Sequence, residues 1–318
     1  MAQVQRLETR LRTGGPVILD GVIGTELERL GARMDQEIWC ARALADSPDI
    51  VHEVHRRYID AGADVITTNS FSATREAMQR CGLGDDFEDW NRRSAHIACE
   101  ERDRSVRSGS IVVAGSVSSY GRFDGLDIET MSGHFRAQGE ILVEEGVDLL
   151  ILETLGSTAR TVKAMVNATG DLGVPVWVSL SCVRARDTGT VMFGIEESHE
   201  APDAVEIHGP LGDAVEEIMS VGGSAVLMMH SVRDVTEDAV KVLRAAYSGP
   251  VGAYPNAGYW TRPNWTFVDQ VTPEAYLADA RRWVDAGAAI VGGCCGVGPE
   301  HIRALAEGLQ DGCRRRHA

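Results

Sequence analysis

Positive charge is scarce in this sequence of 318 residues. Its 47 acidic residues outnumber its 31 lysines and arginines, which gives a formal net charge of −16 with histidine neutral. A chain this acidic lacks a broad positive surface for phosphate backbones, so we expect no nucleic-acid partner. The one clear basic cluster, Arg314 to Arg316, lies in the stretch 312–318, which we interpret as a solvated C-terminal tail.

Long apolar segments are also missing. No apolar run approaches the roughly 18 to 20 residues that cross a bilayer, and the opening MAQVQRLETRLRTGG lacks the apolar stretch of a signal peptide. The seven cysteines do not form the pattern of a disulfide framework. We therefore expect a cytoplasmic protein with reduced thiols and no membrane partner.

Several familiar catalytic motifs are absent as well. The sequence has no G-x-S-x-G elbow, no P-loop, no G-x-G-x-x-G after a first strand and no H-E-x-x-H. Its only lysines, Lys163 and Lys241, lie in helical patterns. Hydrolase and nucleotide-dependent functions have no support, and an aldolase with a catalytic lysine is disfavoured.

Short apolar segments alternate with helical patterns along the whole chain. We predict helices over 48–61, 89–107, 131–145 and 202–221, and strands over 16–19, 64–67, 111–115, 148–152, 174–179, 225–229, 250–253 and 289–292. Strands that are apolar on both faces and alternate with helices are typical of a parallel sheet covered by helices. Eight such units predict an α/β protein with a single (β/α)₈ TIM-barrel domain over 1–318. An open doubly wound sheet is the alternative.

Polar and thiol side chains follow the predicted strands, where a barrel carries its active site. In chain order they are Asp20, Thr68, Asn69, Ser116, Glu153, Ser179, Cys182, His230, Tyr254, Asn256, Cys294 and Cys295. Packing alone does not place carboxylates, a histidine and thiols at the ends of apolar strands. The pattern indicates an active site.

The segment IVGGCCGVGPEHI (290–302) is the most specific candidate for a metal site. Its adjacent cysteines, Cys294 and Cys295, can direct two thiolates at one metal, and soft sulfur ligands favour zinc. A third ligand would come from His230 or from Cys182. The alternative is a glycine-rich turn that binds an anion, as in a phosphate-binding isomerase or aldolase.

Two carboxylates and one aromatic residue complete the candidate site. Asp20 and Glu153 follow apolar strands, where an unpaired charge is costly, so together they suit a substrate ammonium group. A helix cap or a structural salt bridge is the alternative role. Trp39, in QEIWCARAL, can bind a methylated cation or serve as ordinary packing.

The sequence resembles the homocysteine S-methyltransferases, which include betaine-, S-methylmethionine- and cobalamin-dependent enzymes. The matching phrases are ILDGVIGTELERLG, DVITTNSFSAT, VAGSVSSYG, ILETLGSTARTVKA, YPNAGYW and IVGGCCGVGPEHIRAL. The resemblance implies a (β/α)₈ barrel that binds Zn²⁺ through three cysteines. It also implies that homocysteine becomes the fourth ligand and is activated as a thiolate.

The resemblance also assigns residues. Cys294 and Cys295 match the paired zinc ligands, and Asp20 and Glu153 match the carboxylates that hold the amino group of homocysteine. Trp39 resembles the aromatic residue near the methyl donor. Ser72, in DVITTNSFSAT, and Asn256, in the proline-asparagine turn, are the further substrate-binding residues that it implies.

One position departs from the family. The family has a small–Asn–Cys pattern after strand six, whereas this chain reads Met228-Met229-His230. Zinc is held by His230 with Cys294 and Cys295, or Cys182 takes the third place, or tight zinc binding is lost. We favour the first, because neutral imidazole is a good zinc ligand.

The predicted function is zinc-dependent methyl transfer from a sulfonium or quaternary ammonium donor, S-methylmethionine- or betaine-like, to a thiol. Homocysteine is the favoured thiol, which places the reaction in methionine biosynthesis. The alternatives are a methyltransferase for a different thiol and a catalytically silent member of the family that binds an amino acid. The sequence is compatible with a homo-oligomer, and the polar stretch 185–202 is a candidate lid.

Overall fold

Eight parallel strands form the centre of the fold. The computed structural model describes residues 2–121, 123, 125–196, 205–261, 266–268 and 270–316. In spatial order the strands are β1 (Val17–Ile18), β12 (Ile290–Val291), β9 (Val251–Tyr254), β8 (Ala225–Met229), β5 (Val176–Arg184), β4 (Leu149–Thr154), β3 (Val112–Ser118) and β2 (Val65–Thr67). A parallel bridge between Leu19 and Val65 joins the two ends of this series, so the strands close into the predicted (β/α)₈ barrel.

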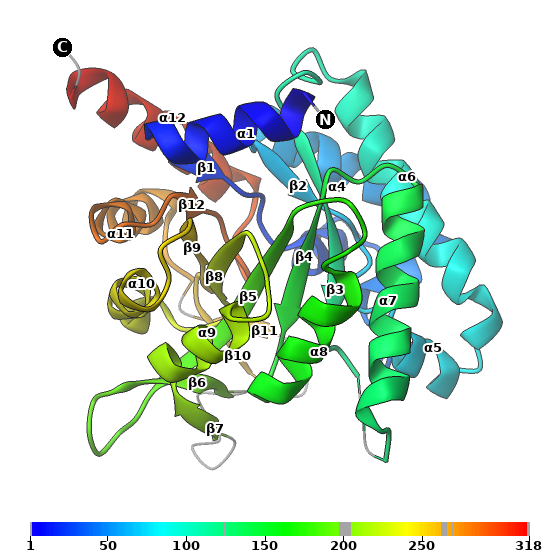
Figure 1. Cartoon of the computed structure of the whole chain (residues 1–318). Helices are drawn as coiled ribbons and strands as arrows, with labels where there is room; N and C mark the ends of the chain where they lie inside the picture. Colours follow the sequence, from blue (N-terminus) through cyan, green and yellow to red (C-terminus); the bar gives the residue numbers. More distant parts are fainter. Residues whose placement is uncertain are drawn as a thin grey trace.

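Helices cover the outside of the barrel (Figure 1). They are α1 (Ala2–Thr13), α2 (Ile23–Arg29), α3 (Ala43–Asp46), α4 (Pro48–Ala61), α5 (Arg75–Arg80), α6 (Phe87–Arg104), α7 (Ile128–Glu144), α8 (Ala159–Thr169), α9 (Leu211–Met219), α10 (Arg233–Ala246), α11 (Pro273–Asp285) and α12 (Pro299–Arg316), with short 3₁₀ turns η1 (Cys40–Arg42) and η2 (Gly84–Asp86). Their ends follow local chemistry. Thr74, Thr158 and Thr272 cap the starts of α5, α8 and α11 with their side chains. Gly62, at φ 105°, ends α4 in the left-handed conformation that glycine tolerates best.

Alternate residues of each strand pack into two separate apolar layers. The inner layer fills the barrel and consists of Val17, Leu19, Val65, Val112, Ala114, Leu149, Ile151, Trp177, Ala225, Leu227, Met229, Tyr254 and Ile290, joined by Leu7 of α1. The outer layer packs between the strands and the helices. Burial of both faces explains why the strands read as continuous apolar runs.

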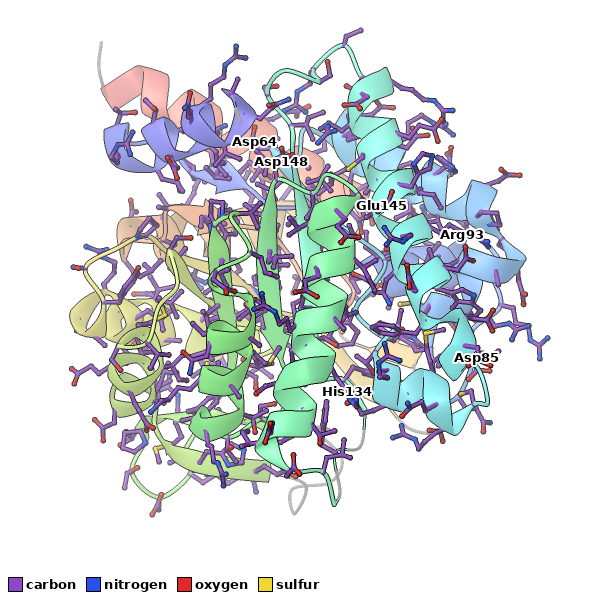
Figure 2. The ribbon with its side chains drawn as sticks, turned by 45° about the vertical axis from the view of Figure 1, so that its right-hand side comes forward. Asp64, Asp85, Arg93, His134, Glu145 and Asp148 are labelled. Carbon is purple, nitrogen blue, oxygen red and sulfur yellow. The ribbon has the colours of Figure 1, made fainter. Side chains whose placement is uncertain are left out.

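The N-terminal end of the barrel is closed and held by ion pairs. Helix α1 lies across this end, opposite the β6–β7 hairpin (Figure 1). Asp64 accepts a hydrogen bond from the backbone N–H of Ile18 and forms ion pairs with Arg10 and Arg107. Figure 2 shows Asp64 and Asp148 close together at this end. The closed base leaves the opposite end for the site.

The structure corrects one predicted helix. Residues 205–210 of the predicted helix 202–221 form β7 (Val205–Pro210), which pairs with β6 (Val191–Glu196), itself paired with β5; α9 begins only at Leu211. The sequence VEIH alternates apolar and polar residues, and this period suits a strand better than a helix. The candidate lid 185–202 contains β6, and its residues 197–202 lie outside the described part of the chain.

Two shorter features complete the fold. Strands β10 (Tyr259–Thr261) and β11 (Thr266–Val268) form a separate antiparallel pair. Helix α12 continues to Arg316, through most of the stretch 312–318 that we interpreted as a tail. Among the described helices, none is both long and apolar enough to cross a membrane.

Replacing the buried carboxylate at the base of the barrel should weaken the fold. We expect Asp64→Ala to lower the free energy of unfolding by about 2 kcal/mol, because it leaves the N–H of Ile18 and two arginines without their acceptor. Urea denaturation measures this change. Asp60→Ala, at an exposed position on α4, is the control and should be neutral; equal stability of the two variants would contradict the role given to Asp64.

Candidate active site

A cavity of about 680 Å³ opens at the C-terminal ends of the barrel strands. The predicted residues that line it are Asp20, Trp39, Thr68, Asn69, Glu153, His230, Tyr254, Cys294 and Cys295. Four carboxylates face this space, from Asp20, Glu28, Glu153 and Glu206, and no lysine or arginine is among the described residues that line it. The cavity is therefore built for ligands that carry positive charge.

His230, Cys294 and Cys295 converge at one side of this cavity. The two sulfur atoms lie 3.9 Å apart, and Nδ1 of His230 lies 3.6 Å from Sγ of Cys294 and 3.4 Å from Sγ of Cys295. A tetrahedral zinc site has edges of about 3.8 Å between sulfurs and about 3.6 Å between sulfur and nitrogen, given its usual bond lengths. The three ligand atoms thus match one face of such a tetrahedron and could hold a metal ion.

The backbone around the cysteines is fixed by hydrogen bonds. The N–H of Cys294 donates to the carbonyl of Pro255 (2.9 Å), and the N–H of Cys295 donates to Oδ1 of Asn256 (3.1 Å). At Gly293 a Cβ atom would lie only 2.1 Å from a methyl carbon of Val297, so a larger residue would displace this turn. His230 has φ 41°, an uncommon value for a residue other than glycine. These contacts fix the backbone that carries the two thiols.

Ionisation of the Cys294 thiol is unfavourable in this site without a cation. The neighbouring Cys295, together with burial, raises the pKa of the Cys294 thiol well above its usual range. A metal ion between the sulfurs would reverse this effect, because it stabilises thiolates directly. The donor set of the site is therefore the kind that a soft or borderline cation completes.

The alternative interpretation of GGCCG as an anion-binding turn has little support, because most backbone N–H groups of this turn already have acceptors. The N–H groups of Gly292, Gly293, Cys294, Cys295 and Val297 all donate to acceptors within the chain. Anion binding at a glycine-rich turn depends on N–H groups that point at the ligand. The hydrogen bonds of these N–H groups instead fix the backbone that carries the two cysteines.

Cys182 does not join the cluster. Its side chain is buried in the outer apolar layer, between strand and helices, and burial raises the pKa of its thiol to about 12. The group of described side chains that could share a metal contains His230, Cys294 and Cys295 alone. Side chains alternate along β5, which is why a cysteine near the strand end faces away from the barrel axis.

Asp20 and Glu153 face the cavity from β1 and β4. Asp20 accepts hydrogen bonds from N–H and Oγ1 of Thr67 (2.7 and 2.9 Å), while Ser116 and Tyr254 donate to Glu153. Burial raises the pKa of both carboxyl groups, and their mutual repulsion raises the pKa of Asp20 further. A bound ammonium group would reverse both effects, which makes the pair a natural cation site.

Three aromatic rings form a wall of the cavity. Trp39 and Phe71 meet edge to face at 6.2 Å between ring centroids, and Phe71 lies 5.3 Å from Tyr120. Sequence reasoning singled out Trp39 but missed Phe71 and Tyr120. Both lie in phrases that follow the second and third strands, and this position is the signal that could have identified them.

Ser72 and Asn256 are buried beside the cavity and are not among the residues that line it. The Ser72 hydroxyl bonds to the backbone of Ile38 and Ala41, and the Asn256 amide bonds to the backbone of Cys295. Ile195 and Glu206, which sequence reasoning also missed, line the cavity from β6 and β7. The antiparallel hairpin after β5 is thus part of the site.

Comparison with known proteins identifies relatives along nearly the whole chain. The family model described as homocysteine S-methyltransferase matches residues 17–309. Homocysteine S-methyltransferase 4 from Zea mays is 32% identical, over 94% of this chain and 90% of its own length. Selenocysteine Se-methyltransferase from Brassica oleracea var. italica is 30% identical, over 92% and 88%.

A solved structure agrees with these relatives. The homocysteine methyltransferase MmuM from Escherichia coli, in its metallated form, is 25% identical and superposes with a TM-score of 0.73, covering 95% of this chain and 99% of that chain.

Loosening the turn that carries Cys295 should weaken metal binding. We expect Asn256→Ala to raise the dissociation constant for Zn²⁺ about tenfold, because a positioning hydrogen bond behind a ligand typically contributes that much. Competition with a chromophoric chelator measures the constant. Asn167→Ala, at an exposed position on α8, is the matched control, and an unchanged affinity in Asn256→Ala would show that the amide does not support the site.

Proposed function

Because the chain belongs to the homocysteine S-methyltransferase family, we propose that it is a zinc-dependent enzyme that transfers a methyl group from a sulfonium or quaternary ammonium donor to homocysteine. The product of this reaction is methionine. The observation that carries the proposal is the convergence of His230, Cys294 and Cys295 on one side of an acidic, aromatic-walled cavity.

The three converging side chains are the proposed zinc ligands. Cys294 and Cys295 provide sulfur and His230 provides Nδ1, with the hydrogen bond from Cys295 to Asn256 fixing the turn. Zn²⁺ bound there would supply the positive charge that lowers the pKa of an added thiol at neutral pH. The fold contributes the fixed orientation of the three ligand atoms.

Asp20 and Glu153 are the proposed partners of the acceptor's ammonium group. Both carboxylates are held by neighbouring donors, so they bind the ammonium without reorienting. The same cavity contains the cysteines, and an amino-acid thiol bound by its ammonium group is thereby directed to the sulfur cluster. Positioning of this kind lowers the barrier by removing the entropy cost of alignment.

The wall of Trp39, Phe71 and Tyr120 is the proposed site of the methyl donor. Aromatic faces attract sulfonium and quaternary ammonium groups, and the surrounding carboxylates strengthen the preference for a cation. In the transfer, a bond forms between the acceptor sulfur and the methyl carbon as the bond from that carbon to the donor breaks. The bonding electron pair stays with the donor, which leaves as a neutral sulfide or amine.

His230 changes the charge of the proposed site. Three thiolates on Zn²⁺ leave a formal charge of −1, whereas two thiolates and a neutral imidazole leave zero. A more positive site favours ionisation of a bound thiol but holds its electrons more tightly, which makes the sulfur less reactive. The alternative to the homocysteine reaction is therefore an acceptor or donor that differs from the usual pair of the family.

A second candidate acceptor follows from the relatives. Two of them, from Brassica oleracea and Astragalus bisulcatus, are named selenocysteine methyltransferases, at 30% and 28% identity. A selenol ionises more readily than a thiol and is the stronger nucleophile, so it would offset the lower reactivity expected at a neutral site. Parallel assays with homocysteine and selenocysteine separate the two acceptors.

Transfer of a labelled methyl group from S-methylmethionine or glycine betaine to homocysteine tests the proposal, and we expect labelled methionine. The KM for homocysteine should rise as the pH falls through the raised pKa values of Asp20 and Glu153, because protonated carboxyls no longer attract the ammonium group. Glu153→Gln should raise this KM about tenfold or more. Glu216→Gln, at an exposed position on α9, should not change it.

Two results would contradict the proposal. The first is a metal-loaded protein that binds homocysteine but transfers no methyl group from any onium donor, which would indicate an amino-acid-binding protein. The second is methyl transfer to other thiols with none to homocysteine, which would move the acceptor to another pathway.

A further inference from the structure

Trp39 has a backbone conformation that is unfavourable for a residue with a large side chain. Its φ is 37° and its ψ is −118°, a region in which a residue with a large side chain is strained. Such strain persists only where surrounding contacts hold the backbone in place. The contacts that hold Trp39 therefore decide where its ring lies.

A local turn supplies the first of these contacts. Oδ1 of Asp35 accepts hydrogen bonds from the N–H groups of Glu37 (2.8 Å) and Ile38 (3.1 Å). The N–H of Asp35 donates in turn to the carbonyl of Trp39 (3.1 Å). This turn shapes the loop but does not attach it to the barrel.

The attachment comes from two buried side chains that follow β2. Oγ of Ser72 donates to the carbonyl of Ile38 (2.7 Å) and accepts from the N–H of Ala41 (3.1 Å). Nδ2 of Asn69 donates to the carbonyl of Cys40 (3.1 Å). The bonded groups lie on both sides of Trp39 in the chain, so Asn69 and Ser72 together hold the loop in place. We call these two side chains the clasp.

The indole ring is seated between two fixed neighbours. A Cβ atom at Gly24 would lie 2.4 Å from the ring, so the absence of a side chain there lets Trp39 pack against α2. Phe71, from the same segment as the clasp, meets the ring edge to face. Small shifts of the loop would therefore move the ring out of the wall.

The segment Thr67–Ser72 reaches both halves of the site. At its start, Thr67 donates two hydrogen bonds to the Asp20 carboxylate. Near its end, Gln138 of α7 donates to the carbonyl of Ser70 (3.0 Å), which ties the segment to the helical layer. One rigid stretch of chain thus supports a carboxylate at one side of the cavity and Trp39 at another.

We propose that Ser72 and Asn69 are positioning residues that hold Trp39 in the wall of the methyl-donor site and set its place relative to Asp20. This inference rests on the proposed function, in which the aromatic wall binds the onium group. It assigns Ser72 an effect on the donor alone, because the hydrogen-bond partners of its hydroxyl are Ile38, Cys40 and Ala41 of the Trp39 loop, and none is Asp20, Cys294 or Cys295.

Ser72→Ala tests the clasp with two readouts. We expect the KM for the methyl donor and the dissociation constant of tetramethylammonium, measured by calorimetry, each to rise about tenfold, as for the loss of a buried hydrogen-bonded hydroxyl. The KM for homocysteine should stay within about twofold, since additivity holds for groups with no shared partner. Ser94→Ala is the control, because this serine of α6 is equally buried and its hydroxyl has no hydrogen-bond partner.

The outcomes separate this inference from the function on which it rests. Unchanged donor KM and tetramethylammonium binding in Ser72→Ala would overturn it, as would an equal loss in Ser94→Ala or an equal rise in both KM values. If Ser72→Ala does not fold, Ser72→Cys provides the same comparison, because it nearly keeps the volume of the side chain and weakens its hydrogen bonds. If Ser72→Ala weakens tetramethylammonium binding as expected but the wild type transfers no methyl group, the proposed function fails and the positioning role stands.

Discussion

Two thiols lie 3.9 Å apart at the mouth of a barrel with an imidazole nitrogen beside both, an arrangement in which the three side chains could share one metal ion. The other candidate substrate-binding groups line the same cavity as this cluster. Strand β8 delivers His230 and the turn after β12 delivers Cys294 and Cys295. These segments are remote in sequence, and they come together because β8 and β12 both pair with β9 in the sheet.

The remainder of the cavity complements positive charge in two ways. Asp20 and Glu153 offer carboxylates for an ammonium group, and Trp39, Phe71 and Tyr120 offer aromatic faces for an onium group. The absence of lysine and arginine from the described lining means that no cationic group of the cavity competes with such ligands. The carboxylates and the aromatic rings lie in two parts of one cavity. This division fits a reaction between two substrates, one with an ammonium group and one with an onium group.

The sequence predicts the barrel well, because eight doubly buried strands give apolar runs at regular intervals, and it predicts the cysteine turn because adjacent thiols at a strand end are chemically distinctive. The helix over 202–221 was wrong in part, since the alternating residues VEIH form β7 and pair with β6. Phe71 and Tyr120 follow predicted strands, but their position alone does not show that the rings face the cavity, because the path of the loop decides this. For the same reason the sequence could not distinguish Ser72 and Asn256, which hold backbone beside the cavity, from residues that line it.

The central claim is that His230 completes a metal site with Cys294 and Cys295. The most direct test is the zinc content per chain, measured by elemental analysis on protein purified without chelator, in the wild type and in His230→Ala. Our account predicts close to one zinc per chain in the wild type and much less in the variant, with both proteins folded by circular dichroism. Full zinc occupancy in the variant would contradict the role of His230, and absence of zinc from the folded wild type would contradict the metal site itself.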